Sequence, residues 1–142
     1  FDLQIPYWHL DQAADLAADF PKIMIIINHT GLPARRDRSD IARWYDALAR
    51  VAERPNIAIK ISGLGLAHQT WSVEANREIV LKAIDLFGTD RCMFASNFPV
   101  DGLCADLGSI IQGFRKIVDH LSDAQRAALF HGNAAQIYRF NS

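Results

Sequence analysis

The chain has 142 residues, of which half are hydrophobic and 22% are charged, and its formal net charge at pH 7 is −1. This length supports one domain with a single hydrophobic core. The 15 Lys and Arg residues are balanced by 16 Asp and Glu residues, and no apolar run reaches the roughly 18 residues of a membrane span. We therefore expect neither nucleic acid nor a membrane as a partner.

Strands and helices alternate in the predicted order of elements. Unbroken apolar runs indicate strands, and apolar residues at three- to four-residue spacing indicate helices. In chain order we expect a strand at 1–5, a helix at 10–20, a strand at 23–28, a helix capped by Ser39, a strand at 57–62, a helix capped by Ser72 and ended by Gly88, a strand at 92–96, a helix along the stripe from Ile110 to Leu121, a helix opened by the capping box of Ser122 and Gln125, and a short helix capped by Asn133.

The strands lack polar alternation, which is typical of parallel strands covered on both faces. Strand-like runs start near residues 23, 57 and 92, a repeat that fits β/α units in an open doubly wound sheet or a closed (β/α)8 barrel. The sequence has no G-x-G-x-x-G loop after its first strand and no G-x-x-x-x-G-K-[ST] loop, which argues against a nucleotide-binding open sheet. We therefore predict an α/β fold that forms half of a (β/α)8 barrel.

The chain begins inside a strand-like run and without Met. We expect residues 1–142 to be the carboxyl-terminal half of a single barrel domain, with the amino-terminal half missing. Half a barrel leaves two unpaired strand edges. We expect the missing half, or another copy of the chain in a homo-oligomer, to cover them.

The two cysteines, Cys92 and Cys104, lack the spacing of a metal site. Cys92 stands in an apolar run, where a free buried thiol is expected. Because both cysteines are expected to be free thiols, we expect the protein to work in the reducing cytoplasm.

Polar side chains stand at the carboxyl ends of all four strands, where sites lie in parallel β/α folds. His29 is the strongest candidate, because an imidazole there can bind a metal, act as a base or polarise a carbonyl; the alternative is a histidine that only bonds loop backbone. The candidates at the four strand ends are Gln4, His29, Lys60, Ser62, Asn97 and Asp101.

Two further groups carry positive charge near these strand ends. Alternation places Lys60 on the face opposite Ile59, in the barrel interior, where it needs a partner. Such a pairing can be structural or catalytic. Arg35 and Arg36 follow the His29 loop and could bind a substrate carboxylate with their forked guanidinium groups, or could form a solvated loop.

Several motifs occur in family order over nearly the whole chain: FDLQI, INHTGLP, RPNIAIKISGLG, FGTDRCMFASNFPVDGL and GNAAQIYRF. With these motifs the chain resembles the carboxyl-terminal half of the amidohydrolase-related ("amidohydrolase 2") family of TIM-barrel hydrolases, near the sugar-lactone hydrolases. The resemblance implies strands five to eight of a distorted barrel, with His29 as the histidine of the sixth strand. His29 would be a metal ligand if a divalent metal such as zinc is bound. A His-x-His pair would lie on the first strand, outside this sequence.

Asn97 departs from the family pattern, because many members carry an acid there that binds metal or acts as the base toward water. An amide cannot take a proton at neutral pH and is a weak metal ligand. Three explanations stay open: a metal-free mechanism in which His29 is the base or electrophile and Asn97 orients the substrate or its water, a carboxylate supplied by Asp101, or the loss of hydrolysis.

The resemblance implies a small-molecule hydrolase that opens a sugar lactone or a dicarboxylate-derived lactone. His29, Asn97 and Asp101 are its expected catalytic residues, and Gln4, Lys60, Ser62, Arg35 and Arg36 its expected substrate contacts. The alternatives are a metal-dependent decarboxylase of the same broad family and a non-catalytic sugar-acid-binding barrel.

Overall fold

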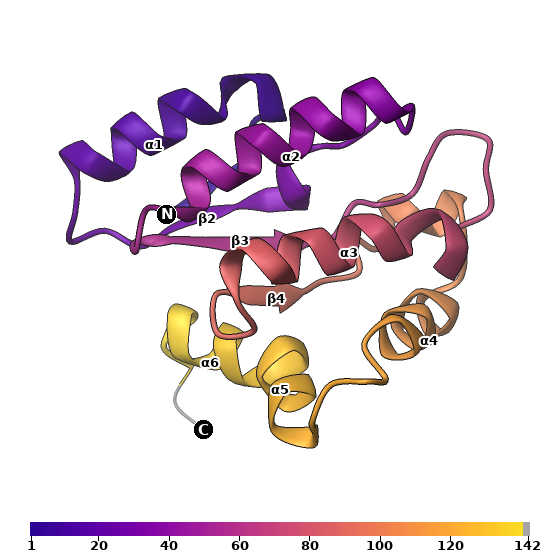
Figure 1. Cartoon of the computed structure of the whole chain (residues 1–142). Coiled ribbons are helices and arrows are strands. Elements are labelled where there is room, and N and C mark those ends of the chain that lie inside the picture. The colour runs from indigo at the N-terminus through magenta and orange to yellow at the C-terminus, as the bar shows by residue number, and fades with distance from the viewer. Residues whose placement is uncertain (141–142) are drawn as a thin grey trace.

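A computed structural model describes residues 1–140 of the chain. Its centre is a parallel four-stranded sheet in the order β1-β2-β3-β4, which confirms the predicted α/β class. Figure 1 shows α1 and α2 side by side over one part of the sheet, with α5 and α6 on its opposite side. The strands are β1 (Asp2–Leu3), β2 (Ile25–Ile27), β3 (Ile57–Ile61) and β4 (Cys92–Phe94).

Helices connect these strands in the order expected from the sequence. The helices are α1 (Leu10–Asp19), α2 (Arg38–Ala52), α3 (Val73–Phe87), α4 (Leu107–Ile117), α5 (Asp123–Ala127) and α6 (Asn133–Tyr138), and the shorter turns are η1 (Tyr7–His9), η2 (Asn28–Gly31), η3 (Val100–Leu103) and the π-helical turn η4 (Ala128–Gly132).

The strands are shorter than predicted because the chain turns sooner. At β4, the Ser96 hydroxyl accepts a hydrogen bond from the backbone N–H of Phe98 at 3.1 Å, so the turn already includes Ser96. At β1, Pro6 follows closely and leads into η1. A proline cannot donate to a strand ladder.

The two faces of the sheet have different coverings. Ile57, Ile59 and Ile61 belong to the main core, which they share with the helices. On the other face, Ala58 packs with Ile26 and Met93 under the side chains of α6. The predicted alternation along β3 is therefore confirmed, and the face that carries Lys60 is the one that α6 covers at one end.

Three of the predicted helix boundaries are confirmed. The Ser72 hydroxyl accepts from the backbone N–H of Ala75 at the start of α3, and Gly88 ends that helix. Ser122 and Gln125 form the predicted capping box at the start of α5.

The prediction that Ser39 caps α2 is wrong. Asp37 is the cap, and its carboxylate accepts from the backbone N–H groups of Ser39 and Asp40, each at 3.1 Å. The hydrogen bond from the Ser39 hydroxyl, at 2.7 Å, and those from the backbone hold the pKa of Asp37 far below its usual value. A carboxylate also interacts favourably with the positive end of the helix dipole, which a serine hydroxyl does not.

The prediction that Asn133 caps the last helix is wrong as well. The helical backbone runs from η4 into α6 without a break, with Gly132 before its first residue. The Asn133 amide instead donates to the carbonyl oxygens of Thr89 and Cys92, both at 2.6 Å. Asn133 therefore ties α6 to the start of β4.

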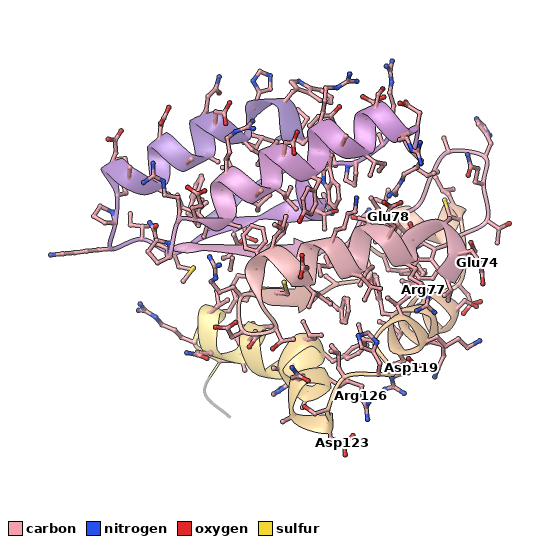
Figure 2. The ribbon with its side chains drawn as sticks, in the orientation of Figure 1. Glu74, Arg77, Glu78, Asp119, Asp123 and Arg126 are labelled. Carbon is pink, nitrogen blue, oxygen red and sulfur yellow. The ribbon has the colours of Figure 1, made fainter. Side chains whose placement is uncertain are left out.

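Charged side chains lie on the outer surfaces of the helices (Figure 2). Arg126 on α5 pairs with Asp123 and donates to the carbonyl oxygen of Asp119 at 3.0 Å, which fixes the turn between α4 and α5. No helix within residues 1–140 combines the length and apolar composition needed to cross a membrane.

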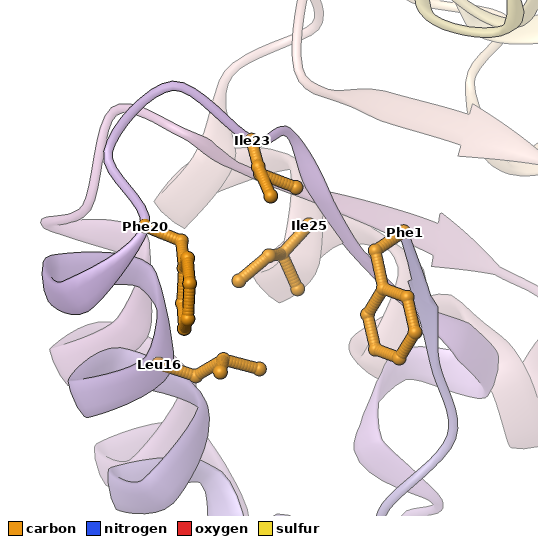
Figure 3. Close-up of a pocket in the computed structure, with 5 residues that line it drawn as sticks. All are labelled: Phe1, Leu16, Phe20, Ile23 and Ile25. Atoms are coloured by element: carbon orange, nitrogen blue, oxygen red, sulfur yellow. The ribbon is translucent and has the colours of Figure 1, made fainter.

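The described sheet ends in two edge strands, β1 and β4. Beside β1, an apolar hollow opens between α1 and the strand edge (Figure 3), lined by Phe1, Leu16, Phe20, Ile23 and Ile25. Phe1 is 66% exposed there. Apolar surface beside an unpaired strand is typical of an edge that another segment covers.

Candidate functional site

His29 stands at the carboxyl end of β2 in a turn of unusual backbone conformation. The φ angles of His29, Thr30 and Gly31 are 55°, 51° and 69°, all left-handed. Such angles cost roughly 1–2 kcal/mol for each non-glycine residue, so the surroundings must hold them. The indole N–H of buried Trp44 does so by donating to the carbonyl oxygen of Thr30 at 2.7 Å.

The imidazole of His29 lies against the end of β3. Its Nδ1 is 3.0 Å from the hydroxyl oxygen of Ser62, a residue that is only 1% exposed. A Cβ atom at Gly63 would come within 2.6 Å of the same Nδ1. Only glycine therefore leaves room for the ring, and the Nδ1 edge faces the residues that directly follow β3.

Asn97 and Asp101 form a second pair at the end of β4. The Asn97 side-chain amide donates to Asp101 Oδ1 at 2.8 Å, and the backbone N–H of Gly65 donates to Asp101 Oδ2 at 3.1 Å. Asp101 is 5% exposed. Asn97 has a φ of 55°, a left-handed conformation that asparagine tolerates better than most residues.

The two pairs meet around the loop that follows β3, because Ser62 and Gly63 contact His29 while Gly65 contacts Asp101. Burial lowers the pKa of His29, and the negative charge of Asp101 opposes that shift without cancelling it. The neutral imidazole is therefore the favoured form of His29 at pH 7, and the Asp101 carboxylate lies at the same loop after β3.

Lys60 has the partner that its interior position requires. Its ammonium group lies 2.8 Å from Asp2 Oδ1, and the Tyr138 hydroxyl donates to the same oxygen at 2.7 Å. Burial alone would lower the pKa of Lys60, but the contacts with Asp2 and Tyr138 outweigh burial and raise it. Lys60 therefore keeps its charge and joins β1, β3 and α6.

Arg35 and Arg36, in the loop before α2, lie in different environments. Arg35 is 79% exposed and lies 4.0 Å from Asp40 Oδ2. Arg36 is partly buried, with Nη2 at 3.4 Å from the carbonyl oxygen of Leu64 and from Asn76 Oδ1. Burial lowers the pKa of Arg36 to about 10, and within residues 1–140 no carboxylate pairs with it.

The fold brings together four of the residues predicted from the sequence: His29, Ser62, Asn97 and Asp101. Gln4 lies exposed just after β1 and makes no side-chain hydrogen bond within the described part of the chain. Sequence reasoning missed Gly63 and Gly65, which contact the two pairs. The signal was the S-G-L-G stretch directly after β3.

Within residues 1–140 these residues do not form a complete zinc centre by themselves. Structural and catalytic zinc takes three or four protein ligands, whereas no three His, Cys, Asp or Glu side chains cluster within residues 1–140. His29 has only its Nε2 atom available as a metal ligand, because Nδ1 faces the Ser62 hydroxyl. Asn97 directs its NH₂ group, which is a donor, at Asp101. Among these residues, Nε2 of His29 is therefore the atom that could bind a divalent metal.

A parallel β/α sheet with polar side chains at the carboxyl ends of its strands is typical of (β/α)8 barrels, whose sites lie at that face. The family model described as Amidohydrolase matches residues 1–140, and the chain belongs to that family. The resemblance seen in the sequence motifs is thereby confirmed.

Relatives and solved structures extend this assignment. The chain is 46% identical to protein y4mH of Sinorhizobium fredii over 139 residues, covering 98% of this chain and 46% of that protein. It is 32% identical over 128 residues to an L-fucono-1,5-lactonase of Burkholderia multivorans, covering 80% of this chain and 42% of the lactonase. An amidohydrolase structure from the same organism, solved with bound zinc, superimposes with a TM-score of 0.92 at 27% identity, covering 99% of this chain and 52% of that one.

The chain thus spans about half the length of the curated relatives it matches. Its four strands correspond to the carboxyl-terminal part of the TIM-barrel amidohydrolase fold, as the sequence predicted.

Proposed function

We propose that the protein is a hydrolase that opens a lactone, with a sugar lactone or a dicarboxylate-derived lactone as substrate. The observation that carries this proposal is the buried Asp101 carboxylate, which Asn97 and Gly65 orient at the strand ends where His29 also lies. The similarity to L-fucono-1,5-lactonase supports the substrate class.

Asp101 supplies the carboxylate that Asn97 cannot. An ionised carboxylate has about four acceptor positions, and Asn97 and Gly65 occupy two of them. The remaining positions can accept a proton from water as the water oxygen attacks the ring carbonyl carbon. The carbonyl electron pair moves to oxygen, the ring C–O bond then breaks, and the leaving oxygen takes up the proton.

His29 acts at the same carbonyl. As a neutral imidazole it has one ring nitrogen that donates and one that accepts. If the free nitrogen is the acceptor, His29 is a base for water; if it is the donor, His29 polarises the carbonyl. Replacing His29 by Ala is expected to lower the rate by roughly 10²-fold or more in either role.

Cationic groups around the site suit an acidic sugar or dicarboxylate. Arg36 has no acid partner within the described residues, and Arg35 is exposed nearby. Lys60 stands in β3 on the face opposite Ile59, and Gln4 is exposed just after β1. These residues are proposed to contact substrate polar groups once a closed barrel surrounds the site.

The open edges indicate how such a barrel would close. The apolar hollow beside β1 and the exposed Phe98, Val100 and Leu103 after β4 lie next to unpaired strands. We propose that an amino-terminal half barrel or a second copy of the chain covers them. Light scattering measures the mass of the chain in solution, and a dimer would support coverage by a second copy. A monodisperse 142-residue monomer that unfolds cooperatively would contradict both forms of coverage.

The lactonase proposal is tested by proton release from a panel of sugar and dicarboxylate lactones. The Asp101→Asn variant should lose roughly 10²-fold or more in rate, whereas Asp46→Asn, at an exposed aspartate on α2, should not. Release of carbon dioxide from aromatic acids would instead identify a decarboxylase, and binding of sugar acids without turnover would identify a binding barrel.

A further inference from the structure

Ser62 and His29 form a contact whose hydrogen can be assigned by counting donors and acceptors. The Ser62 hydroxyl has one donor hydrogen, and the neutral His29 ring has one N–H. Within residues 1–140 the only side-chain hydrogen bond of Ser62 is the one to His29 Nδ1 at 3.0 Å. The direction of that bond decides which nitrogen carries the ring proton.

The two directions differ in what they leave unpaired. If Nδ1–H donated to Ser62, the buried hydroxyl hydrogen would have no acceptor among the described residues. An unpaired buried donor costs roughly 1–3 kcal/mol. If the hydroxyl donates to Nδ1, its hydrogen is paired, and only oxygen lone pairs remain unused, which is the cheaper arrangement.

The backbone conformation and the surroundings of His29 place Nδ1 next to the Ser62 hydroxyl. The left-handed φ of His29 and the contact of Nδ1 with Gly63 hold the Nδ1 edge against the end of β3. Ser62 is 1% exposed, so water does not compete for its hydroxyl. The Nε2 edge is therefore the one that can face a reacting group.

We propose that Ser62 is a positioning residue that donates its hydroxyl hydrogen to His29 Nδ1 and thereby fixes the ring proton on Nε2. His29 then presents an N–H donor to the carbonyl oxygen of the substrate, and the proton of water goes to Asp101. This assignment rests on the proposed lactone hydrolysis for its catalytic meaning. It replaces the sequence-based expectation that Ser62 contacts substrate.

The test is the ¹⁵N NMR spectrum of the imidazoles in the labelled full chain above pH 7, with His29 assigned by comparison with His29→Gln. The expected result is a protonated Nε2 and an unprotonated, hydrogen-bonded Nδ1. A ring proton on Nδ1 overturns the proposal. This readout needs no substrate, so lack of turnover on every lactone would contradict the proposed function while the tautomer result still decides the role of Ser62.

Two variants separate positioning from packing. Ser62→Ala removes the donor, and His29 should become a mixture of tautomers with kcat lowered roughly 3- to 10-fold at unchanged KM, the scale of one hydrogen bond. Ser62→Thr keeps the hydroxyl and should restore the wild-type tautomer and rate. A Ser62→Ala variant with the wild-type tautomer overturns the proposal. If that variant does not fold, the wild-type spectrum decides alone.

Discussion

The side-chain amide of Asn97 donates a hydrogen bond to the carboxylate of Asp101 over 2.8 Å. This contact explains an asparagine at the end of β4. An aspartate at position 97 would place two carboxylates within hydrogen-bonding distance of each other, where like charges repel. An amide instead satisfies a buried carboxylate, and the acid of the site lies four residues further along the chain.

Changing Asn97 should therefore disturb Asp101. Asn97→Asp is expected to lower both the thermal stability and the lactonase rate, the rate by roughly tenfold or more, because it replaces a donor with a like charge. Asn97→Gly keeps a residue that accepts the left-handed φ but removes the amide, and should also lower the rate. A wild-type rate in Asn97→Asp would show that Asp101 does not depend on this bond.

The ionisation of His29 should be visible in the pH dependence of stability and rate. Its pKa lies below 6.5, mainly because of burial. Between that lowered pKa and 6.5 the unfolded chain binds more protons than the folded chain, so the free energy of unfolding rises with pH and the gain is complete above 6.5. The rate should fall as pH drops through the lowered pKa, because the active ring is neutral.

An NMR titration of His29 measures this pKa directly. Asp101→Asn should lower it further, because the charge of Asp101 raises it in the wild-type protein. A His29 pKa at or above 6.5 in the wild-type protein would contradict the described burial of the ring.

Gly63 is predicted to tolerate no side chain. Its φ is +62°, and a Cβ there would lie 2.6 Å from His29 Nδ1. Gly63→Ala should lower the free energy of unfolding by roughly 1 kcal/mol or more and displace the imidazole, with a loss of rate. The matched control is Gly132→Ala, since Gly132 is helical and the nearest atom to its Cβ position is 3.7 Å away; that change should be neutral or stabilising.

The Tyr138 hydroxyl is predicted to hold α6 against the sheet. It donates to Asp2 Oδ1 at 2.7 Å, beside Lys60. Tyr138→Phe should lower the free energy of unfolding by roughly 0.5–1 kcal/mol, the scale of one partly exposed hydrogen bond. Tyr45→Phe is the control, because the Tyr45 hydroxyl makes no hydrogen bond within residues 1–140. Equal denaturation midpoints for the two variants would remove the Tyr138 bond from the account.

Much of the fold could be predicted from the sequence, because parallel strands covered on both faces leave unbroken apolar runs. The strand predicted at 57–62 is β3 (Ile57–Ile61), and its alternation correctly put Ile59 and Lys60 on opposite faces. The caps of α2 and α6 could not be predicted. Asp37 and Ser39 are both good caps in isolation, and the role of Asn133 depends on carbonyl groups of Thr89 and Cys92 that are remote in sequence.

The candidate site was predictable in its residues but not in its pairings. Strand ends identified His29, Ser62 and Asp101, because parallel strands bring their carboxyl ends to one edge. The sequence could not show that Ser62 faces His29 or that Asn97 faces Asp101, since these contacts depend on left-handed turns after β2 and β4. The partner of Lys60 likewise comes from Asp2 and Tyr138, at opposite ends of the chain.

We propose lactone hydrolysis without a metal and with Asp101 as the proton acceptor, and proton release on sugar and dicarboxylate lactones in the presence and absence of a chelator tests this proposal most directly. The account predicts turnover that survives the chelator and falls roughly 10²-fold or more in Asp101→Asn. Turnover abolished by the chelator, or unchanged in Asp101→Asn, would contradict it.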